Sequence, residues 1–324
     1  MSLLAVAVAF VVSALAVAAV RRWADRLPHA HPGSRTLHQR PVPRVGGLAI
    51  LAGTLAAVAA EPPGLPGSPG VWIASVAAVV AVSLADDFRG VAPAVRLAVH
   101  LAASVALGIA LFGAGAWGLA AGLAIAWGAN LYNFMDGSDG LAATMAVVGF
   151  GAYAVASANV AAPWTLAAAI AVSALPFLAV NRPPASMFMG DVGAVPLGLL
   201  AAALGCAGVA AGHWAPWFPL LVFLPFLADA TATLALRAYR RERVWEAHRS
   251  HFYQRLHLAG AGHRGTLAVY AADMLACALL ALACAVARPQ AGWLALAVAV
   301  TLHAIGFLAI VYHVGNNKAR GTSR

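Results

Sequence analysis

The chain has 324 residues, of which 62% are hydrophobic and 10% are charged. Soluble domains carry about a quarter of charged residues, so this composition excludes an ordinary soluble protein. The formal net charge of +9 could suggest a nucleic-acid partner. Its distribution along the chain instead follows membrane topology, and we expect no nucleic acid to bind. The three cysteines, Cys206, Cys277 and Cys284, lie in apolar runs without metal-binding spacing, and we interpret them as small buried apolar side chains.

Apolar runs recur almost from end to end and predict an all-α polytopic membrane protein, because a spanning segment must satisfy its backbone hydrogen bonds within itself. Arg21 and Arg22 follow the first run, whereas a cleaved signal carries its positive charge before the run. We therefore expect a retained first helix. No stretch resembles a separate soluble domain, which predicts one transmembrane domain over residues 1–324. The eleven predicted spans are residues 3–20, 46–60, 71–85, 94–112, 115–131, 141–158, 163–180, 194–212, 216–236, 266–287 and 291–312.

The positions of the basic residues support this topology. With the N-terminus outside, nineteen of the twenty Arg and Lys residues lie at inner ends of spans, and only Arg288 lies outside. This agrees with the positive-inside rule. The polar clusters also lie on the inner side, which favours an enzyme with a cytoplasm-facing cleft over a transporter with a polar site at mid-membrane. The loops expected to form the site are 21–46, 86–93, 130–141, 181–193 and 237–265.

Carboxylates and carboxamides are concentrated in residues 130–141. Asn130, Asn133, Asp136 and Asp139 occur there between two apolar runs. Oxygen ligands at this density suit a hard divalent cation and the phosphates that it carries. The alternative is an ordinary polar turn between two membrane helices.

Two further segments offer carboxylates. Asp86 and Asp87 are adjacent at the inner end of an apolar run, where a bound Mg²⁺ would offset their repulsion. One of the two could act as a base. The alternative is a solvated helix end paired with Arg89. Asp191 stands between glycines at the start of a later span and is a candidate single ligand.

Basic residues form two clusters suited to phosphate. Arg35, His38 and Arg44 lie in a proline-containing first loop. The alternative for these arginines is that they only set topology. His248, Arg249 and His251 lie in the longest inner loop, where the neighbouring arginines argue against zinc and favour phosphate recognition. The alternative there is a basic surface facing anionic lipid.

Together, these clusters predict phosphoryl transfer at a membrane surface, and their order resembles the polyprenyl-phosphate N-acetylhexosamine-1-phosphate transferases, glycosyltransferase family 4. No single motif decides the resemblance, but the ordered set over residues 35–255 is specific. The matching motifs are Arg35…His38…Pro41-x-Pro43-Arg44-x-Gly46-Gly47, Asp86-Asp87-x-x-Gly90, Asn130-x-x-Asn133-Phe-Met-Asp136-Gly-x-Asp139-Gly-Leu, Phe188-Met189-Gly190-Asp191-Val-Gly193, Asp229 followed by Arg237, and His248-Arg249-x-His251.

The resemblance implies a cofactor and roles for these residues. It implies Mg²⁺ or Mn²⁺ held near Asp191 and Asn133. It implies that Asp86 and Asp87 contact the acceptor phosphate or tune the site, with Asp86 as a debated base. The remaining implied roles are nucleotide and loop support for Asp136 and Asp139, and binding of the donor's pyrophosphate or sugar for His248, Arg249 and His251.

The resemblance also implies the partners and the location. These are a UDP-N-acetylhexosamine donor, a polyprenyl (undecaprenyl) phosphate acceptor and the lipid bilayer of the bacterial inner membrane, and a homodimer is left open. Ala194 stands where the family often has Ser, and the last motif lacks the family's extra adjacent histidines. That motif is more similar to the O-antigen-initiating branch, so the donor sugar stays open.

Two rival interpretations remain at this level. A CDP-alcohol phosphotransferase would need an Arg and further carboxylates that residues 136–150 lack. A transporter of nucleotide sugars or lipid-linked sugars is the non-enzyme alternative, and it would release no UMP.

Overall fold

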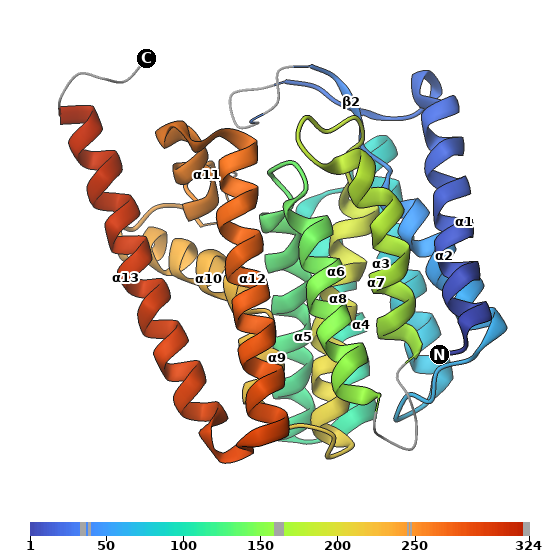
Figure 1. Ribbon diagram of the computed structural model, residues 1–324. Helices are drawn as coiled ribbons and strands as arrows, with labels where there is room; N and C mark the ends of the chain where they lie inside the picture. The colour runs from blue at the N-terminus through green and yellow to red at the C-terminus, as the bar shows by residue number, and fades with distance from the viewer. Residues whose placement is uncertain (33–36, 38–39, 159–164, 245, 247, 320–324) are drawn as a thin grey trace.

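The computed structural model shows a bundle of long helices whose polar loops gather at one end (Figure 1). It describes residues 1–32, 37, 40–158, 165–244, 246 and 248–319, with side chains described as far as residue 312. The all-α prediction is confirmed, apart from one two-residue strand pair. The long helices are α1 (Leu3–Arg22), α2 (Gly47–Ala60), α3 (Pro69–Arg89), α4 (Pro93–Phe112), α5 (Ala116–Met135), α6 (Leu141–Ser157), α7 (Thr165–Asn181), α8 (Asp191–Ala210), α10 (Leu224–Tyr239), α12 (Gly262–Ala287) and α13 (Gly292–Ala319).

Among the described residues, six helical segments are long and apolar enough to cross a membrane, and three shorter apolar helices accompany them. The helix positions agree with the predicted spans to within a few residues, while the count of eleven membrane crossings stays a prediction. The long segments are Leu3–Arg22, Pro69–Arg89, Pro93–Phe112, Asp191–Ala210, Phe252–Ala287 and Pro289–Tyr312. The shorter ones are Gly47–Ala60, Leu141–Ser157 and Thr165–Asn181.

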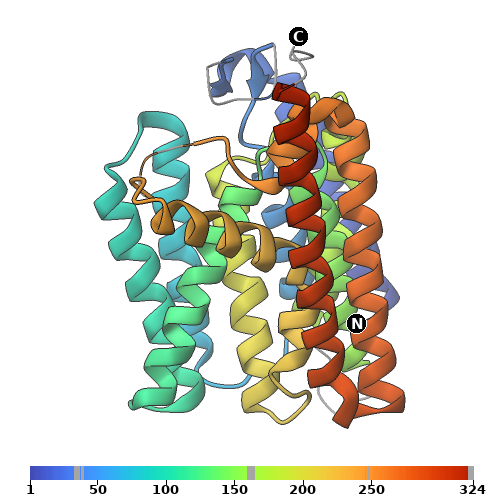
Figure 2. The ribbon, with the colours of Figure 1, turned by 90° about the vertical axis from the view of Figure 1, so that its left-hand side faces the viewer.

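The predicted span 216–236 is not one helix. It breaks at Phe223, whose φ of −98° and ψ of 13° end the short helix α9 (Trp217–Val222). Pro225 then lies in the first turn of α10, where its missing N–H costs nothing and its ring resists continuation from α9. Figure 2 shows the result: α10 runs across the bundle instead of along it.

The predicted inner loop 237–265 also contains structure. Residues Phe252–Leu256 form the short helix α11, and one turn of π-helix, His257–Ala261, joins it to α12. The first inner loop contributes two short antiparallel strands, β1 (His29–Ala30) and β2 (Val42–Pro43).

The α8 helix occupies the centre of the bundle. It is buried over 83% of its most apolar stretch, against 6% for the C-terminal segment Pro289–Tyr312. Small residues permit this position because backbones can approach closely where side chains are small. A Cβ built on Gly198 would lie 2.5 Å from the Gly128 carbonyl of α5, and one on Gly47 of α2 would lie 2.2 Å from Gly193 Cα.

The contact between Gly47 and Gly193 generates a prediction for stability. The Gly47→Ala substitution should destabilise the fold by about 1–3 kcal/mol, because its methyl group meets backbone atoms that cannot rotate away. The matched control is Gly151→Ala in α6, where no atom lies within 4 Å of the added Cβ. Thermal unfolding in detergent, measured as the fraction of protein that still elutes as a single peak in size-exclusion chromatography after heating, should show a lower midpoint for the Gly47→Ala variant only. Equal midpoints would contradict the close packing.

Candidate active site

Asp87 joins the end of one helix to the start of another. It lies in the last turn of α3 and is 2% exposed. Its carboxylate accepts backbone N–H bonds from Asp191 at 3.3 Å and from Val192 at 2.9 Å, which are the first residues of α8. The first N–H groups of a helix have no intrahelical acceptors, and the helix dipole favours negative charge there. Asp87 therefore fixes the position of Asp191.

Arg96 connects the two neighbouring carboxylates. This residue lies in the first turn of α4, and its Nη1 is 2.5 Å from Asp86 Oδ2 and 2.8 Å from Asp191 Oδ2. The other oxygen of Asp86 accepts the N–H of Val91 at 2.6 Å. Residues 86, 96 and 191 are therefore brought together from three helices. The sequence analysis missed Arg96, because the carboxylate that it joins to Asp86 lies 95 positions further along the chain.

Arg44, in the first inner loop, contacts Asp86 and Asp87. Its Nη2 donates to the backbone carbonyls of Asp87 at 2.5 Å and Asp86 at 3.4 Å, which end α3. Its Nε lies 3.7 Å from Asp87 Oδ1. Gly190 is needed beside it, because its φ is +74° and a Cβ there would lie 1.8 Å from the Arg44 carbonyl oxygen.

The end of α5 and the loop after it carry further side chains with oxygen atoms. Asp136 caps the C-terminal end of α5 and is partly buried. Burial raises the pKa of its carboxyl well above the ordinary value, and the negative charges of Asp191 and Asp87 add to the effect. Asn130 donates to the Ala126 carbonyl at 2.7 Å. Asn133 is also half-buried, and no other described residue hydrogen-bonds to its side chain.

Asp139 holds this loop in place. Its carboxylate accepts the N–H of Ala185 at 2.9 Å and lies 3.5 Å from Nδ1 of His263. The next residue, Gly140, donates its N–H to Asn181 Oδ1 at 3.1 Å. The loop that carries Asp136 is therefore fastened to the α7–α8 connection and to the start of α12. His263 and Asn181 are structural partners that the sequence analysis did not identify.

Asp229 holds the start of α11 in the same way as Asp87 holds the start of α8. It also orients one member of the histidine cluster, which consists of His248, Arg249 and His251. It is fully buried, and it accepts the N–H groups of Phe252 and Tyr253, both at 2.9 Å, at the start of α11. It also accepts the Tyr270 hydroxyl at 2.5 Å. His251 Nδ1 lies 3.2 Å from the same carboxylate, which orients the imidazole ring.

The other two members of the cluster differ in exposure. His248 is half-buried, and its Nδ1 accepts the Ser250 hydroxyl at 2.9 Å. Burial lowers the pKa of His248 to about 4, and the nearby His251 and Arg237 add to the effect, so the ring is neutral at neutral pH. Arg249 is exposed, and no described carboxylate pairs with it.

Two contacts bring the histidine cluster to the carboxylates. The Tyr253 hydroxyl donates to the Phe134 carbonyl at 3.1 Å, and the rings of Phe134 and His251 stack with centroids 6.1 Å apart. A Cβ on Gly137 would lie 2.1 Å from the Tyr253 hydroxyl, so glycine permits this approach. The structure thus places His251 beside the loop of Asp136. Arg35 and His38, predicted for the first loop, lie outside the described residues.

A cation fits the chemistry of these donors. Five carboxylates meet two arginines and one histidine among the described residues of this region, which leaves a surplus of hard oxygen donors. Arg96 lies between two of the carboxylates, and no three of the described ones have oxygens within 4.8 Å of one another. This arrangement suits Mg²⁺, which is usually bound by one or two carboxylates together with water and substrate phosphates.

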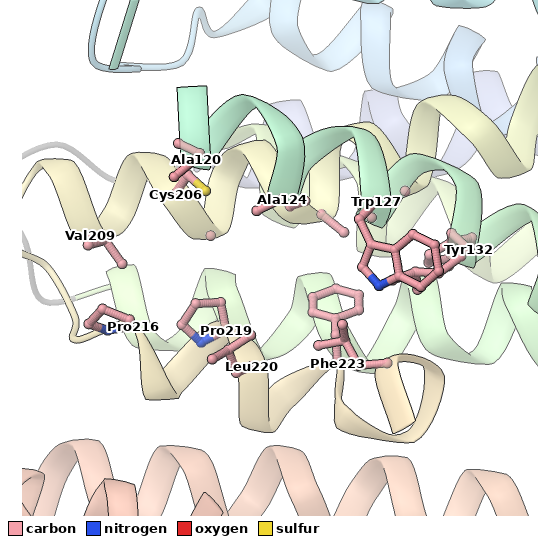
Figure 3. Close-up of a pocket in the computed structure, with 18 of the residues that line it drawn as sticks. Ala120, Ala124, Trp127, Tyr132, Cys206, Val209, Pro216, Pro219, Leu220 and Phe223 are labelled. Carbon is pink, nitrogen blue, oxygen red and sulfur yellow. The ribbon is translucent and has the colours of Figure 1, made fainter. Parts of the chain in front are cut away.

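An apolar groove leads to this region. It has a volume of about 460 Å³ and is lined mainly by α5, α8 and α9, with single residues from α4, α6 and α10. Figure 3 shows its lining, from Pro216 and Val209 to Trp127 and Tyr132. Tyr132 directly precedes Asn133 in the chain, so one end of the groove lies beside the polar site.

Comparison with known proteins shows the family of this chain. The sequence profile of glycosyl transferase family 4 matches residues 70–209. The chain is 28% identical to the probable undecaprenyl-phosphate N-acetylglucosaminyl 1-phosphate transferase of Bacillus subtilis, over 82% of this chain and 80% of the relative. It is 30% identical to the decaprenyl-phosphate N-acetylglucosaminephosphotransferase of Mycolicibacterium smegmatis, over 72% of this chain and 70% of the relative.

A third relative matches over a shorter region. The chain is 44% identical to the phospho-N-acetylmuramoyl-pentapeptide-transferase of Geobacillus thermodenitrificans, over 22% of each protein. The family resemblance drawn from the ordered motifs is thereby confirmed. With its apolar helices, this chain is a multi-pass membrane protein that belongs to glycosyl transferase family 4.

Proposed function

We propose that the protein transfers an N-acetylhexosamine-1-phosphate from a UDP-sugar to a polyprenyl phosphate, giving a polyprenyl-pyrophosphoryl sugar and UMP. The observation that carries this proposal is the junction of an apolar groove with a cluster of carboxylates and a cluster of histidines. The product would initiate a cell-surface glycan of the O-antigen type. The polar end of the bundle would face the cytoplasm of a bacterial inner membrane, as its basic loops favour.

The groove supports a lipid acceptor. An isoprenoid chain is apolar and long, and the groove is lined almost entirely by apolar side chains and small residues. Its rim includes the exposed side chains of Trp117 and Leu220. An acceptor lying there would present its phosphate near Asn133 and Asp191, where the polar site begins.

The relatives support the class of donor. Those of Bacillus subtilis and Mycolicibacterium smegmatis are both named for N-acetylglucosamine phosphate transfer. UDP-N-acetylglucosamine is therefore the first donor to test. Other N-acetylated amino sugars should be tested as donors too, because the final motif, His248-Arg249-x-His251, lacks the additional histidines of the GlcNAc-type enzymes.

The carboxylates suit a magnesium-dependent reaction. Asp191 and Asn133 are the residues that would hold Mg²⁺ (or Mn²⁺), and the ion would neutralise charge on the donor phosphates. Asp87 would keep Asp191 in position through the start of α8. Arg96 would hold Asp86 and Asp191 at a fixed separation and add positive charge where the phosphates meet.

The chemistry requires little proton transfer. An oxygen of the acceptor phosphate attacks the β-phosphorus of the donor, the bond between that phosphorus and the bridging oxygen breaks, and UMP leaves with the bridging oxygen. A phosphate monoester has its second pKa near ~6, so the acceptor is mostly dianionic at neutral pH. Asp86 already accepts bonds from Arg96 and Val91. These bonds favour a positioning role for Asp86 over a role as base.

The histidine cluster is suited to the donor's pyrophosphate. His251 is oriented by buried Asp229, while the exposed Arg249 is available for a bidentate contact with phosphate. Asp229 anchors this loop without facing the reacting atoms.

The direct test is UMP release by purified protein. We expect release from one member of a panel of UDP-N-acetylhexosamines when undecaprenyl phosphate and Mg²⁺ are present, and loss of release with EDTA. The measurement names the donor sugar at the same time. Folded protein that moves a labelled sugar across vesicles but releases no UMP would be a transporter, and the proposal would be wrong.

Asp191 and Asp87 should respond differently to substitution by Asn. Asp191→Asn should abolish nearly all UMP release with little change in thermal midpoint. Asp87→Asn should also lower the midpoint, because an amide nitrogen would face a buried N–H of α8 and cost about 1–3 kcal/mol. Exposed Asp25→Asn is the control and should change neither quantity. Near-normal turnover in the Asp191 variant would contradict its assigned role.

The groove can be tested by filling it. Ala124 lines the groove and is exposed, so Ala124→Trp should occupy the groove without disturbing the core. We expect the KM for undecaprenyl phosphate to rise about tenfold, equivalent to ~1.4 kcal/mol, with the KM for the donor unchanged. Leu123→Trp, on the exposed face of the same helix but outside the groove, is the matched control. A rise of similar size in both variants would argue against acceptor binding in the groove.

A further inference from the structure

Three side chains with metal-binding atoms meet between the last two helices, away from the active site. Asp273 and Cys277 lie one turn apart on α12, and His303 lies on α13. One carboxylate oxygen, the thiol sulfur and one imidazole nitrogen all lie within 4.8 Å of one another. Figures 1 and 2 both show α12 and α13 at one edge of the bundle, joined at their lower ends.

The group lies in the apolar middle of these helices. Asp273 is eleven residues after the first residue of α12 (273 − 262), and His303 is eleven residues after the first residue of α13 (303 − 292). At 1.5 Å per residue, each lies about 16 Å from its helix start. Ionisable residues at such a depth are costly in a membrane and usually have a function.

The hydrogen bonds of His303 restrict what lies between it and Asp273. Nδ1 is 2.8 Å from the Ala299 carbonyl, which can only accept, so Nδ1 carries a hydrogen. Nε2 is 2.9 Å from Asp273 Oδ2. If neither a proton nor a cation lay between the two atoms, the lone pair of Nε2 would face a carboxylate oxygen. Either a proton or a metal cation must therefore lie between the two atoms.

Cys277 adds a third ligand and favours the metal. Its buried sulfur is 3.7 Å from Asp273 Oδ1. With a divalent cation, a thiolate, a carboxylate and a neutral imidazole, the site has zero net charge, as it also has with a thiol and one proton shared by Nε2 and Oδ2, so the cation adds no net charge to the apolar surrounding. The cation would replace two protons, one from the sulfur and one shared by Nε2 and Oδ2, and both would be released to solvent.

We propose that Asp273, Cys277 and His303 form a binding site for a divalent cation of the zinc class. Zn²⁺ accepts sulfur, nitrogen and oxygen ligands, and in tetrahedral geometry its ligand atoms lie about 3.4 Å apart. The distances of 2.9 Å and 3.7 Å lie on either side of that value. The bond from Nδ1 to Ala299 is the outer-shell contact that normally fixes a metal-binding histidine.

The position of the site connects it to the histidine cluster. Tyr270, one turn before Asp273, donates to Asp229, and Asp229 caps α11. Phe307, one turn after His303, stacks on Phe252 of α11 with ring centroids 3.9 Å apart. A cation here would fasten α12 to α13 and so would hold the two helices on which α11 rests.

Cobalt substitution tests the site. Full-length protein, purified without a polyhistidine tag and stripped of metal, would be titrated with Co²⁺. We expect one equivalent to give a thiolate-to-cobalt charge-transfer band and tetrahedral visible bands, both lost on addition of Zn²⁺. Co²⁺ bound by oxygen ligands in the active site would give neither signal, so the result does not depend on the proposed transferase activity.

Variants identify the ligands. Cys277→Ser should remove the charge-transfer band, and His303→Gln should change the visible bands and weaken binding at least tenfold. Cys284→Ser, on the same helix without such partners among the described residues, should retain the full signal. Size-exclusion chromatography would show that each variant is folded. No charge-transfer band in folded wild-type protein, or its loss in Cys284→Ser, would overturn the proposal and leave a proton between His303 and Asp273.

Discussion

The candidate active site depends on one interaction, the capping of a helix start by a carboxylate from another helix. Asp87 accepts the first two N–H groups of α8 and thereby sets where Asp191 lies relative to Asp86 and Arg96. Hydrogen bonds to a charged group contribute about 1.5–3 kcal/mol each, and they are strongest where water is absent. Because α8 is also the central helix of the bundle, the same bonds tie the polar site to the core.

This capping of a helix start by a buried carboxylate occurs twice. Asp229 caps α11 as Asp87 caps α8, with a pair of backbone N–H groups on a buried carboxylate. In each case a carboxylate in a long helix positions a residue at the start of another helix, Asp191 in one case and His251 in the other. The acidic side chains of this chain therefore differ in use. Some are held in the structure by backbone donors, and others are the candidates for contact with substrate.

The helices were predictable from the sequence because apolar runs, glycines and prolines are local signals. The break at Phe223 was missed although Pro225 is a local signal for it, and only the packing shows that α10 turns across the bundle. The polar clusters were predictable as motifs, but their partners were not. Arg96 and His263 gain their meaning from contacts with residues 95 and 124 positions away, which spacing along the chain does not reveal.

The break between α9 and α10 bears on access from the membrane, because Phe223 at the break lines the apolar groove together with α5 and α8. Exposed side chains on its rim, among them Trp117 and Leu220, leave the groove open on one side. Under the proposed function, a lipid acceptor would enter there by lateral diffusion within one leaflet, without being lifted out of the bilayer. Only the isoprene units nearest the phosphate would be in contact with protein, and the remainder of the tail would stay dissolved among acyl chains. Under the proposed function, such an enzyme would distinguish acceptors by their phosphate end and not by the length of their tail.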